Sequence, residues 1–151
     1  MRPLGKRKRR IDDRQELPGV AAVARIRFRV FQDEDGRVAA LREGVAEREL
    51  KLLRGKRCEP GAILDLHGMR TSQVAAEVRD FLRVQQAKGV RTVLLVHGKG
   101  IHSEAGVGVL GEHLVKALTQ GPVAGLVRAL TIAEEGLGGR GAMVVQLTKV
   151  R

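Results

Sequence analysis

Two apolar segments that each end in His-Gly constrain the fold of this chain most strongly. They are ILDLHG, residues 63–68, and VLLVHG, residues 93–98. Both are short apolar runs, which is typical of strands covered by other elements. The stretch between them has apolar side chains at helical spacing and then a glycine suited to a helix C-terminus: Val74, Val78, Phe81, Leu82 and Gly89. A strand, a crossover helix and a second strand place the two strands parallel in one sheet.

The chain after residue 98 continues this alternation. Apolar side chains at Val107, Leu110, Leu114 and Leu118 predict a second helix, which ends at Gly121-Pro122. A third strand is expected at 123–133, and a fourth in AMVVQLTKV after the turn EEGLGGRG. We therefore expect an α/β fold, a two-layer sandwich of order β-α-β-α-β-β with a four-stranded mixed sheet and two helices. The first three strands should be parallel and the last antiparallel to its predecessor.

The part of the chain before residue 60 has a different character. Its unbroken basic run, Lys6 to Arg10, favours a flexible basic tail over residues 1–19. We expect residues 20–59 to form an extension and linker, in which ARIRFRVF alternates like a strand and residues 38–54 fit a helix. The main domain is placed at residues 60–151.

The charge of the chain indicates a polyanionic partner. Its 28 Lys and Arg exceed its 17 Asp and Glu, for a formal net charge of +11, and residues 1–57 hold 17 of the basic and 9 of the acidic groups. Such an excess favours RNA or DNA. Three Phe and no Tyr or Trp provide little for base stacking, so phosphate contacts are the expected mode of binding.

The composition also disfavours several classes of protein. One cysteine, Cys58, cannot form an intramolecular disulfide, which fits a reducing compartment. No apolar run approaches the roughly 20 residues of a membrane span, and the basic N-terminus lacks the apolar core of a secretory signal. We expect a cytoplasmic protein with no membrane partner.

Ionisable side chains lie where the two His-Gly strands end. Asp65 and His67 are two residues apart, so they share one face of a strand. His67 and His97 both end parallel strands, where ligands bind in open α/β sheets. Since an imidazole exchanges protons near neutral pH and a carboxylate can orient it, Asp65 and His67 are candidate catalytic residues for phosphodiester cleavage.

The turns after these strands are candidate phosphate sites. Glycines let the backbone approach a ligand, helix N-termini present free N–H groups, and a lysine adds charge. The candidate set is Gly68, His97, Gly98, Lys99, Gly100 and, more weakly, His102. We expect no cofactor and no metal. A metal held by Asp65, His67 and His97 ranks lower, because no carboxylate cluster accompanies them.

Three motifs together resemble those of the small MutS-related (Smr) domain: LDLHGMRTSQVA, VLLVHGKG and GGRGAMVVQL. The resemblance covers about residues 60–150 and includes features of the stand-alone bacterial type. It implies a fold similar to the C-terminal domain of translation initiation factor three. It also implies endonuclease activity, as members nick DNA or cut RNA, some of them messenger RNA at collided ribosomes.

The resemblance also implies roles for particular residues. It assigns cleavage to the element Asp65-Leu66-His67 and nucleic-acid binding to His97–Gly100. Its GG-x-GA element falls on Gly138, Gly139, Arg140, Gly141 and Ala142, and the first four of these are further candidate contacts to nucleic acid. Many members have a basic residue or histidine before the paired glycines, whereas this chain has Glu134-Glu135-Gly136-Leu137.

We therefore expect a nucleic-acid-binding endonuclease, with RNA slightly favoured over DNA, that cuts ribosome-associated mRNA or nicks DNA. The alternative is a non-catalytic nucleic-acid- or ribosome-binding module. The basic N-terminal region suits that alternative, because binding alone needs only charge.

Overall fold

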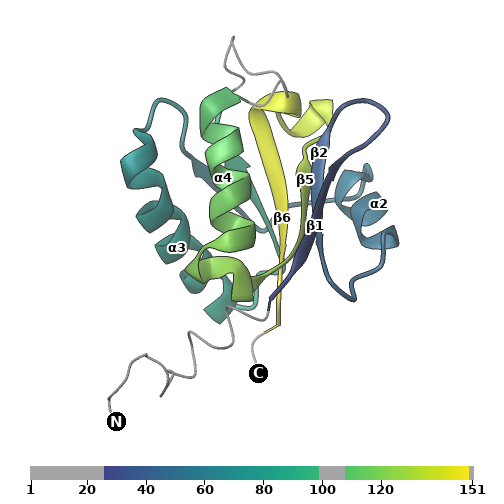
Figure 1. The fold of residues 1–151 in the computed structure, drawn as a ribbon, viewed down its shortest axis with the longest axis horizontal. Helices are drawn as coiled ribbons and strands as arrows, with labels where there is room; N and C mark the ends of the chain where they lie inside the picture. The colour runs from purple at the N-terminus through teal and green to yellow at the C-terminus, as the bar shows by residue number, and fades with distance from the viewer. Residues whose placement is uncertain (1–25, 99–107, 150–151) are drawn as a thin grey trace, which may run out of the picture.

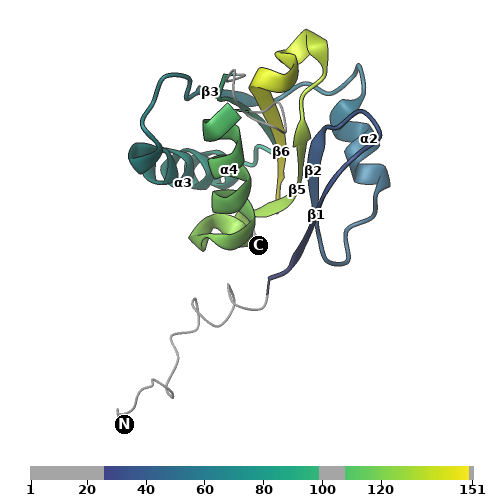
Figure 2. The same cartoon turned by 45° about the horizontal axis from the view of Figure 1, so that its top comes forward.

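The computed structural model describes residues 26–98 and 108–149, which form a six-stranded mixed sheet between helices (Figures 1 and 2). In chain order its main elements are β1 (Phe28–Gln32), β2 (Val38–Arg42), α2 (Arg48–Arg54), β3 (Ala62–Asp65), α3 (Thr71–Ala87), β4 (Thr92–Val96), α4 (Gly108–Gln120), β5 (Val127–Ile132) and β6 (Ala142–Leu147). Three short 3-10 helices are η1 (Pro122–Leu126), η2 (Glu135–Leu137) and η3 (Gly139–Gly141). Figure 1 shows α3 and α4 on one side of the sheet and α2 on the other.

The sheet has the strand order β1-β2-β5-β6-β4-β3. Strands β3 and β4 are parallel, and β6 is antiparallel to both of its neighbours, β4 and β5. Strands β3, β4 and β5 therefore point the same way, as predicted, and their carboxyl ends lie at the same end of the sheet. The order β-α-β-α-β-β is confirmed from β3 onward.

The prediction of four strands and two helices is wrong in detail, because β1, β2 and α2 belong to the same structure. Residues 38–54 were expected to be one helix, but residues 38–42 form β2 and the helix begins at Arg48. All of Val38 to Leu41 is buried, alternately toward α3/α4 and toward α2. A strand covered on both faces gives a continuous apolar run, which also fits helical spacing.

The core consists of two apolar layers, one on each side of the sheet. Val78, Leu82 and Leu114 lie in the layer under α3 and α4, whereas Leu50 and Leu53 of α2 lie in the other. Helix α3 begins at Thr71 and ends before Gly89, which has φ +86° and lies where the sequence predicted the helix C-terminus. Within residues 26–98 and 108–149, no helix has the length and apolar composition needed to cross a membrane.

Candidate active site

Asp65 and His67 form a hydrogen-bonded pair where β3 ends. The Oδ1 of Asp65 accepts a hydrogen bond from the His67 backbone N–H at 3.1 Å and lies 2.7 Å from Nδ1 of the His67 ring. Both side chains are exposed, Asp65 to 57% and His67 to 70%. Leu64 and Leu66 face the opposite way, into the layer under α3 and α4. The prediction that Asp65 and His67 share one face is confirmed, and their contact leaves the ring open to a substrate.

The electrostatics of this pair determine which ring nitrogen can react. The hydrogen bond from the His67 side chain, followed by that from its backbone N–H, lowers the pKa of the Asp65 carboxyl below its ordinary value. An ionised carboxylate only accepts hydrogen bonds, so the Nδ1–H of His67 donates to it. The carboxylate therefore fixes the tautomer and leaves Nε2 as the atom that takes up or releases a proton.

The ring of His97 lies in a different environment. His97 follows β4, in which Val93 and Leu95 are buried toward α3 and α4, and it continues their alternation. Its side chain is buried, with 3% exposed, and Nδ1 donates to the Gly98 carbonyl at 2.7 Å. Because Val96 pairs with Asp65, His97 lies on the opposite face of the sheet from the Asp65–His67 pair. The two rings do not face one cleft, contrary to expectation, and a buried ring is poorly placed for direct substrate contact.

The backbone of the second His-Gly turn nevertheless lies beside the first. A Cβ added to Gly98, which has φ +85°, would lie 3.7 Å from the His67 Cβ. The N–H groups of His97 and Gly98 both donate to the Gly141 carbonyl, at 2.9 and 3.0 Å. The turns after β3 and β4 and the turn before β6 therefore form one cluster at the carboxyl ends of the parallel strands, where the sequence predicted a site.

The glycine-rich turn before β6 is held by the hairpin of β1 and β2. Arg140 donates from Nη2 to the Asp35 carbonyl at 2.7 Å, and Arg37 pairs with Glu134 at 3.2 Å. Gly138 has φ +113°, and a Cβ there would lie 2.9 Å from that of Ala142, so this position requires glycine. The acidic residue Glu134 thus has a structural partner, and Arg140 is half-buried and oriented by the hairpin.

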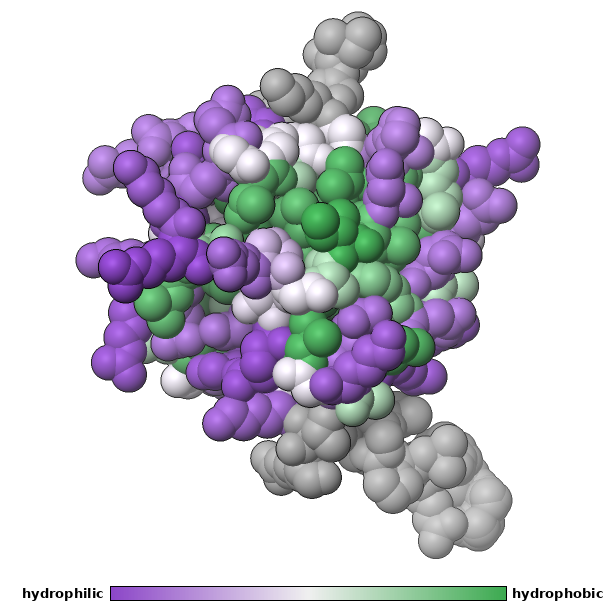
Figure 3. All heavy atoms as spheres, turned by 180° about the vertical axis from the view of Figure 1, so that it is seen from behind, coloured by the Kyte–Doolittle hydropathy of each residue, from purple (hydrophilic) through white to green (hydrophobic). Residues whose placement is uncertain are grey.

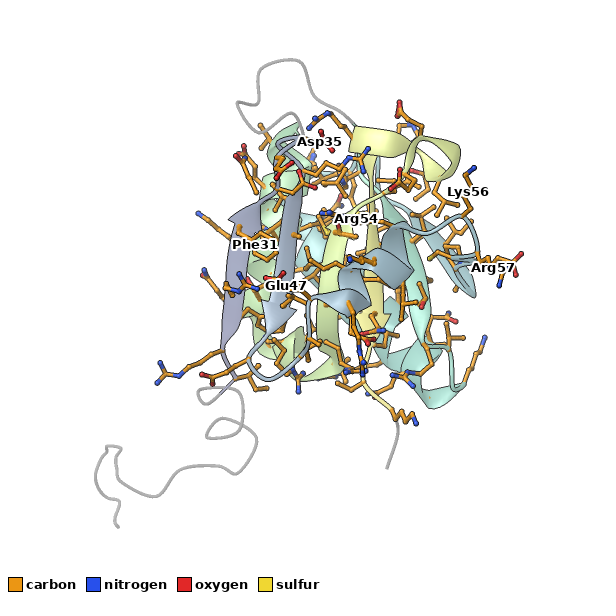
Figure 4. All side chains as sticks on the ribbon, turned by 90° about the vertical axis from the view of Figure 1, so that its right-hand side faces the viewer. Phe31, Asp35, Glu47, Arg54, Lys56 and Arg57 are labelled. Atoms are coloured by element: carbon orange, nitrogen blue, oxygen red, sulfur yellow. The ribbon has the colours of Figure 1, made fainter. Side chains whose placement is uncertain are left out.

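Arg54 at the end of α2 links the hairpin to the sheet, and sequence reasoning missed it. Figure 4 shows it below Asp35, between α2 and the strands. Its Nη1 lies 2.8 Å from Asp33 Oδ2, and its Nε donates to Thr131 Oγ1 at 2.8 Å. Burial raises the pKa of the Asp33 carboxyl, but the N–H of Arg37 and the charge of Arg54 outweigh it and hold that pKa below its ordinary value. Arg54 and Thr131 are 77 residues apart, so no local pattern indicates their contact.

The remaining predicted site residues are only partly described. Gly68 is exposed at φ +77° and turns the chain toward α3, whereas Lys99, Gly100 and His102 lie outside the described residues. Over residues 26–98 and 108–149, no three or more His, Cys, Asp or Glu side chains are grouped to hold a metal ion.

A family model described as the Smr domain matches residues 64–148. The match runs from β3 to just beyond β6 and includes the Asp65–His67 pair. This chain belongs to the Smr domain family. The resemblance of its three motifs to that family is thereby confirmed.

Related Smr-domain proteins extend the similarity beyond the matched residues. A ribosome rescue factor SmrB from Aeromonas hydrophila is 30% identical over 147 residues, which are 97% of this chain and 79% of the relative. A protein of the same name from Aliivibrio salmonicida is 30% identical over 116 residues, but the chain spans only 60% of its length. The structure of YdaL, a stand-alone small MutS-related protein from Escherichia coli, has a TM-score of 0.56 at 26% identity and covers 84% of this chain and 86% of its own.

Proposed function

We propose that this Smr-domain protein is a nucleic-acid-binding endonuclease that cleaves phosphodiester bonds, with RNA favoured over DNA. The observation that carries the proposal is the exposed Asp65–His67 pair, with a 2.7 Å contact at Nδ1 that leaves Nε2 free for proton transfer. The motif to which the family resemblance assigns cleavage falls on the same two residues. A net charge of +11 suits a polyanionic substrate.

The favoured chemistry uses the RNA 2′-hydroxyl as the nucleophile. Nε2 of His67 takes the hydroxyl proton while the 2′-oxygen attacks the adjacent phosphorus. Asp65 keeps its hydrogen bond to Nδ1 and stabilises the imidazolium that forms. The bond from phosphorus to the 5′-oxygen breaks, giving a 2′,3′-cyclic phosphate, and the departing oxygen takes a proton from solvent or from a second acid such as His102.

Backbone groups of the clustered turns would hold the phosphate. Gly68 and Gly98 carry no side chain that would block a ligand beside His67, and Gly68 leads to the N-terminal turn of the 17-residue helix α3. The buried His97 is proposed to position the Gly98 turn through its ring and backbone hydrogen bonds. Lys99, Gly100 and Arg140 remain proposed phosphate contacts, and Gly138, Gly139 and Gly141 give the second turn its shape.

The names of the relatives suggest where such an activity is used. Two similar proteins are called ribosome rescue factors, so we propose messenger RNA on the ribosome as the substrate, and the cytoplasm as the location. If cleavage instead proceeds by metal-assisted hydrolysis, DNA nicking also becomes possible.

Labelled RNA and DNA of the same sequence, each incubated with and without EDTA, test the proposal. We expect RNA to be cut in EDTA and DNA to remain intact, because DNA lacks the 2′-hydroxyl. His67→Ala should abolish cutting but retain binding, whereas His113→Ala on α4 is the matched control and should cut normally. Equal cleavage of DNA in EDTA would rule out the 2′-hydroxyl route.

One observation favours the alternative of a non-catalytic binding module. Because the His97 ring is buried, the expected pair of histidines does not face the substrate together. A binding module would show a steep dependence of affinity on salt and would leave RNA intact after long incubation. Cleavage by wild-type protein that is lost in His67→Ala excludes this alternative.

A further inference from the structure

Strand β3 presents an exposed row of side chains that leads to the candidate active site. β3 is an edge strand, paired with β4 alone within the described part of the chain. Ile63 is 62% exposed and lies on the same face as Asp65, and His67 continues the row. Side chains two residues apart on a strand are separated by about 6.6 Å, which suits one nucleotide of an extended single strand.

Two cations of the segment between α2 and β3 lie beside this row. Cys58 packs against the layer that contains Leu94 and Val96, and these two residues pair in register with Ile63 and Asp65. Lys56 and Arg57 immediately precede Cys58, and both are exposed. In Figure 4 Lys56 and Arg57 lie far from Phe31 of β1, at the right of the view. Strand β1 is one edge of the sheet and β3 is the other, so the two cations lie toward the β3 edge.

The β3 edge combines an exposed apolar side chain, Ile63, with the exposed cations Lys56 and Arg57. Figure 3 shows the side of the molecule turned away in Figure 1, with a hydrophobic centre and hydrophilic side chains around it. Single-stranded nucleic acid needs this combination, since bases require apolar contact and phosphates require cations. Lys56 also lines a cleft together with Glu134 and Glu135, and the negative charge of these two residues disfavours a phosphate path through that cleft.

We propose that single-stranded RNA binds along β3 past the Asp65–His67 pair, and that Ile63, Lys56 and Arg57 supply the binding contacts of this track. Ile63 contacts the base next to the phosphate at His67, and the two cations bind neighbouring phosphates. The inference rests on the proposed function in placing the scissile phosphate at His67, but it concerns binding and is tested by binding.

Fluorescence anisotropy of a labelled single-stranded RNA, titrated at several salt concentrations in EDTA, tests the two cations. Each phosphate contact on a single strand contributes about 0.7 to the slope of log affinity against log salt, so Lys56→Gln with Arg57→Gln should reduce that slope by about 1.4. Lys88→Gln with Lys116→Gln removes the same charge from exposed positions of the α3/α4 side and should leave the slope nearly unchanged. Equal slopes for the two double variants overturn the inference.

A second pair of variants tests the apolar contact. Ile63→Thr should weaken RNA binding about fivefold, because a half-buried contact loses its apolar surface. Val30→Thr is the matched control, since Val30 is 48% exposed on β1 at the opposite edge of the sheet. Both variants keep a β-branched residue and should melt at the wild-type temperature.

The outcomes separate this inference from the proposed function. Reduced binding in the variants without any cleavage by wild-type protein supports the track and refutes the endonuclease. If wild-type protein cleaves RNA and Ile63→Thr binds RNA as tightly as wild type, the inference about the track is wrong and the proposed endonuclease stands. If Ile63→Thr leaves RNA binding intact but abolishes self-association in sedimentation, the β3 edge is a protein interface and the inference is wrong.

Discussion

Helix α2 offers a sharp test of the fold, because two neighbouring leucines on it have opposite surroundings. Leu53 is 2% exposed and lies in the apolar layer with Leu41 and Leu94, whereas Leu52 is 63% exposed. If α2 is part of the Smr-domain structure, truncation of these two side chains must have very different effects on stability. We predict that Leu53→Ala strongly destabilises the protein and that Leu52→Ala does not.

The size of the effect follows from the burial of each leucine. Truncating a fully buried leucine costs the transfer free energy of the lost methyl groups plus that of the cavity, about 3 kcal/mol in total. Truncating an exposed side chain changes the unfolding free energy by less than about 0.5 kcal/mol. For a domain of this size, 1 kcal/mol shifts Tm by about 3 °C, so Leu53→Ala should lower Tm by about 9 °C.

Urea titration followed by circular dichroism measures both variants against wild type, and calorimetry gives their Tm. Leu52→Ala is the control, because it removes the same side-chain atoms from the neighbouring, exposed position of α2. If both variants lose the same small amount of stability, α2 does not pack on the sheet, and the packing described for the segment before β3 is wrong.

Three further predictions concern the turns and the pair at the site. Because the pKa of Asp33 is lowered in the folded state, its carboxylate stabilises the protein above its ordinary pKa of 3.8, and this contribution is lost as pH falls through the lower folded value. In urea titrations, the stability deficit of Asp33→Asn relative to wild type should therefore shrink below about pH 4. Gly138→Ala should cost about 2 kcal/mol by thermal melting, through its positive φ and its contact with Ala142, while Gly136→Ala, which meets no atom within 4 Å, should cost far less. Asp65→Asn should slow RNA cleavage by at least about tenfold in single-turnover assays while leaving binding intact, because it removes the charge that stabilises the imidazolium.

Much of the fold from β3 onward could be predicted from the sequence, because local signals determine it. Apolar runs, the glycine at position 89 and the rule for crossover connections together give the element order and strand directions. The shared face of Asp65 and His67 follows from the two-residue period of a strand. Each of these inferences needs only a few neighbouring residues.

The failures of prediction involve pairing between distant segments. The sequence around β2 fits a helix as well as a buried strand, and only its pairing with β1 and β5 decides between them. The face occupied by His97 depends on the register of β4 against β3, which neither strand encodes alone. The contact of Arg54 with Thr131 also could not be predicted, because the two residues are distant in sequence.

The chemical identity of the RNA ends tests the central claim most directly. Wild-type protein and His67→Ala are incubated with RNA in EDTA, and the 3′ ends of the fragments are determined by mass spectrometry. If Asp65 and His67 activate the 2′-hydroxyl, wild-type protein leaves 2′,3′-cyclic phosphate ends and His67→Ala leaves the RNA intact. The same cyclic ends produced at the same rate by His67→Ala would contradict the role assigned to this pair.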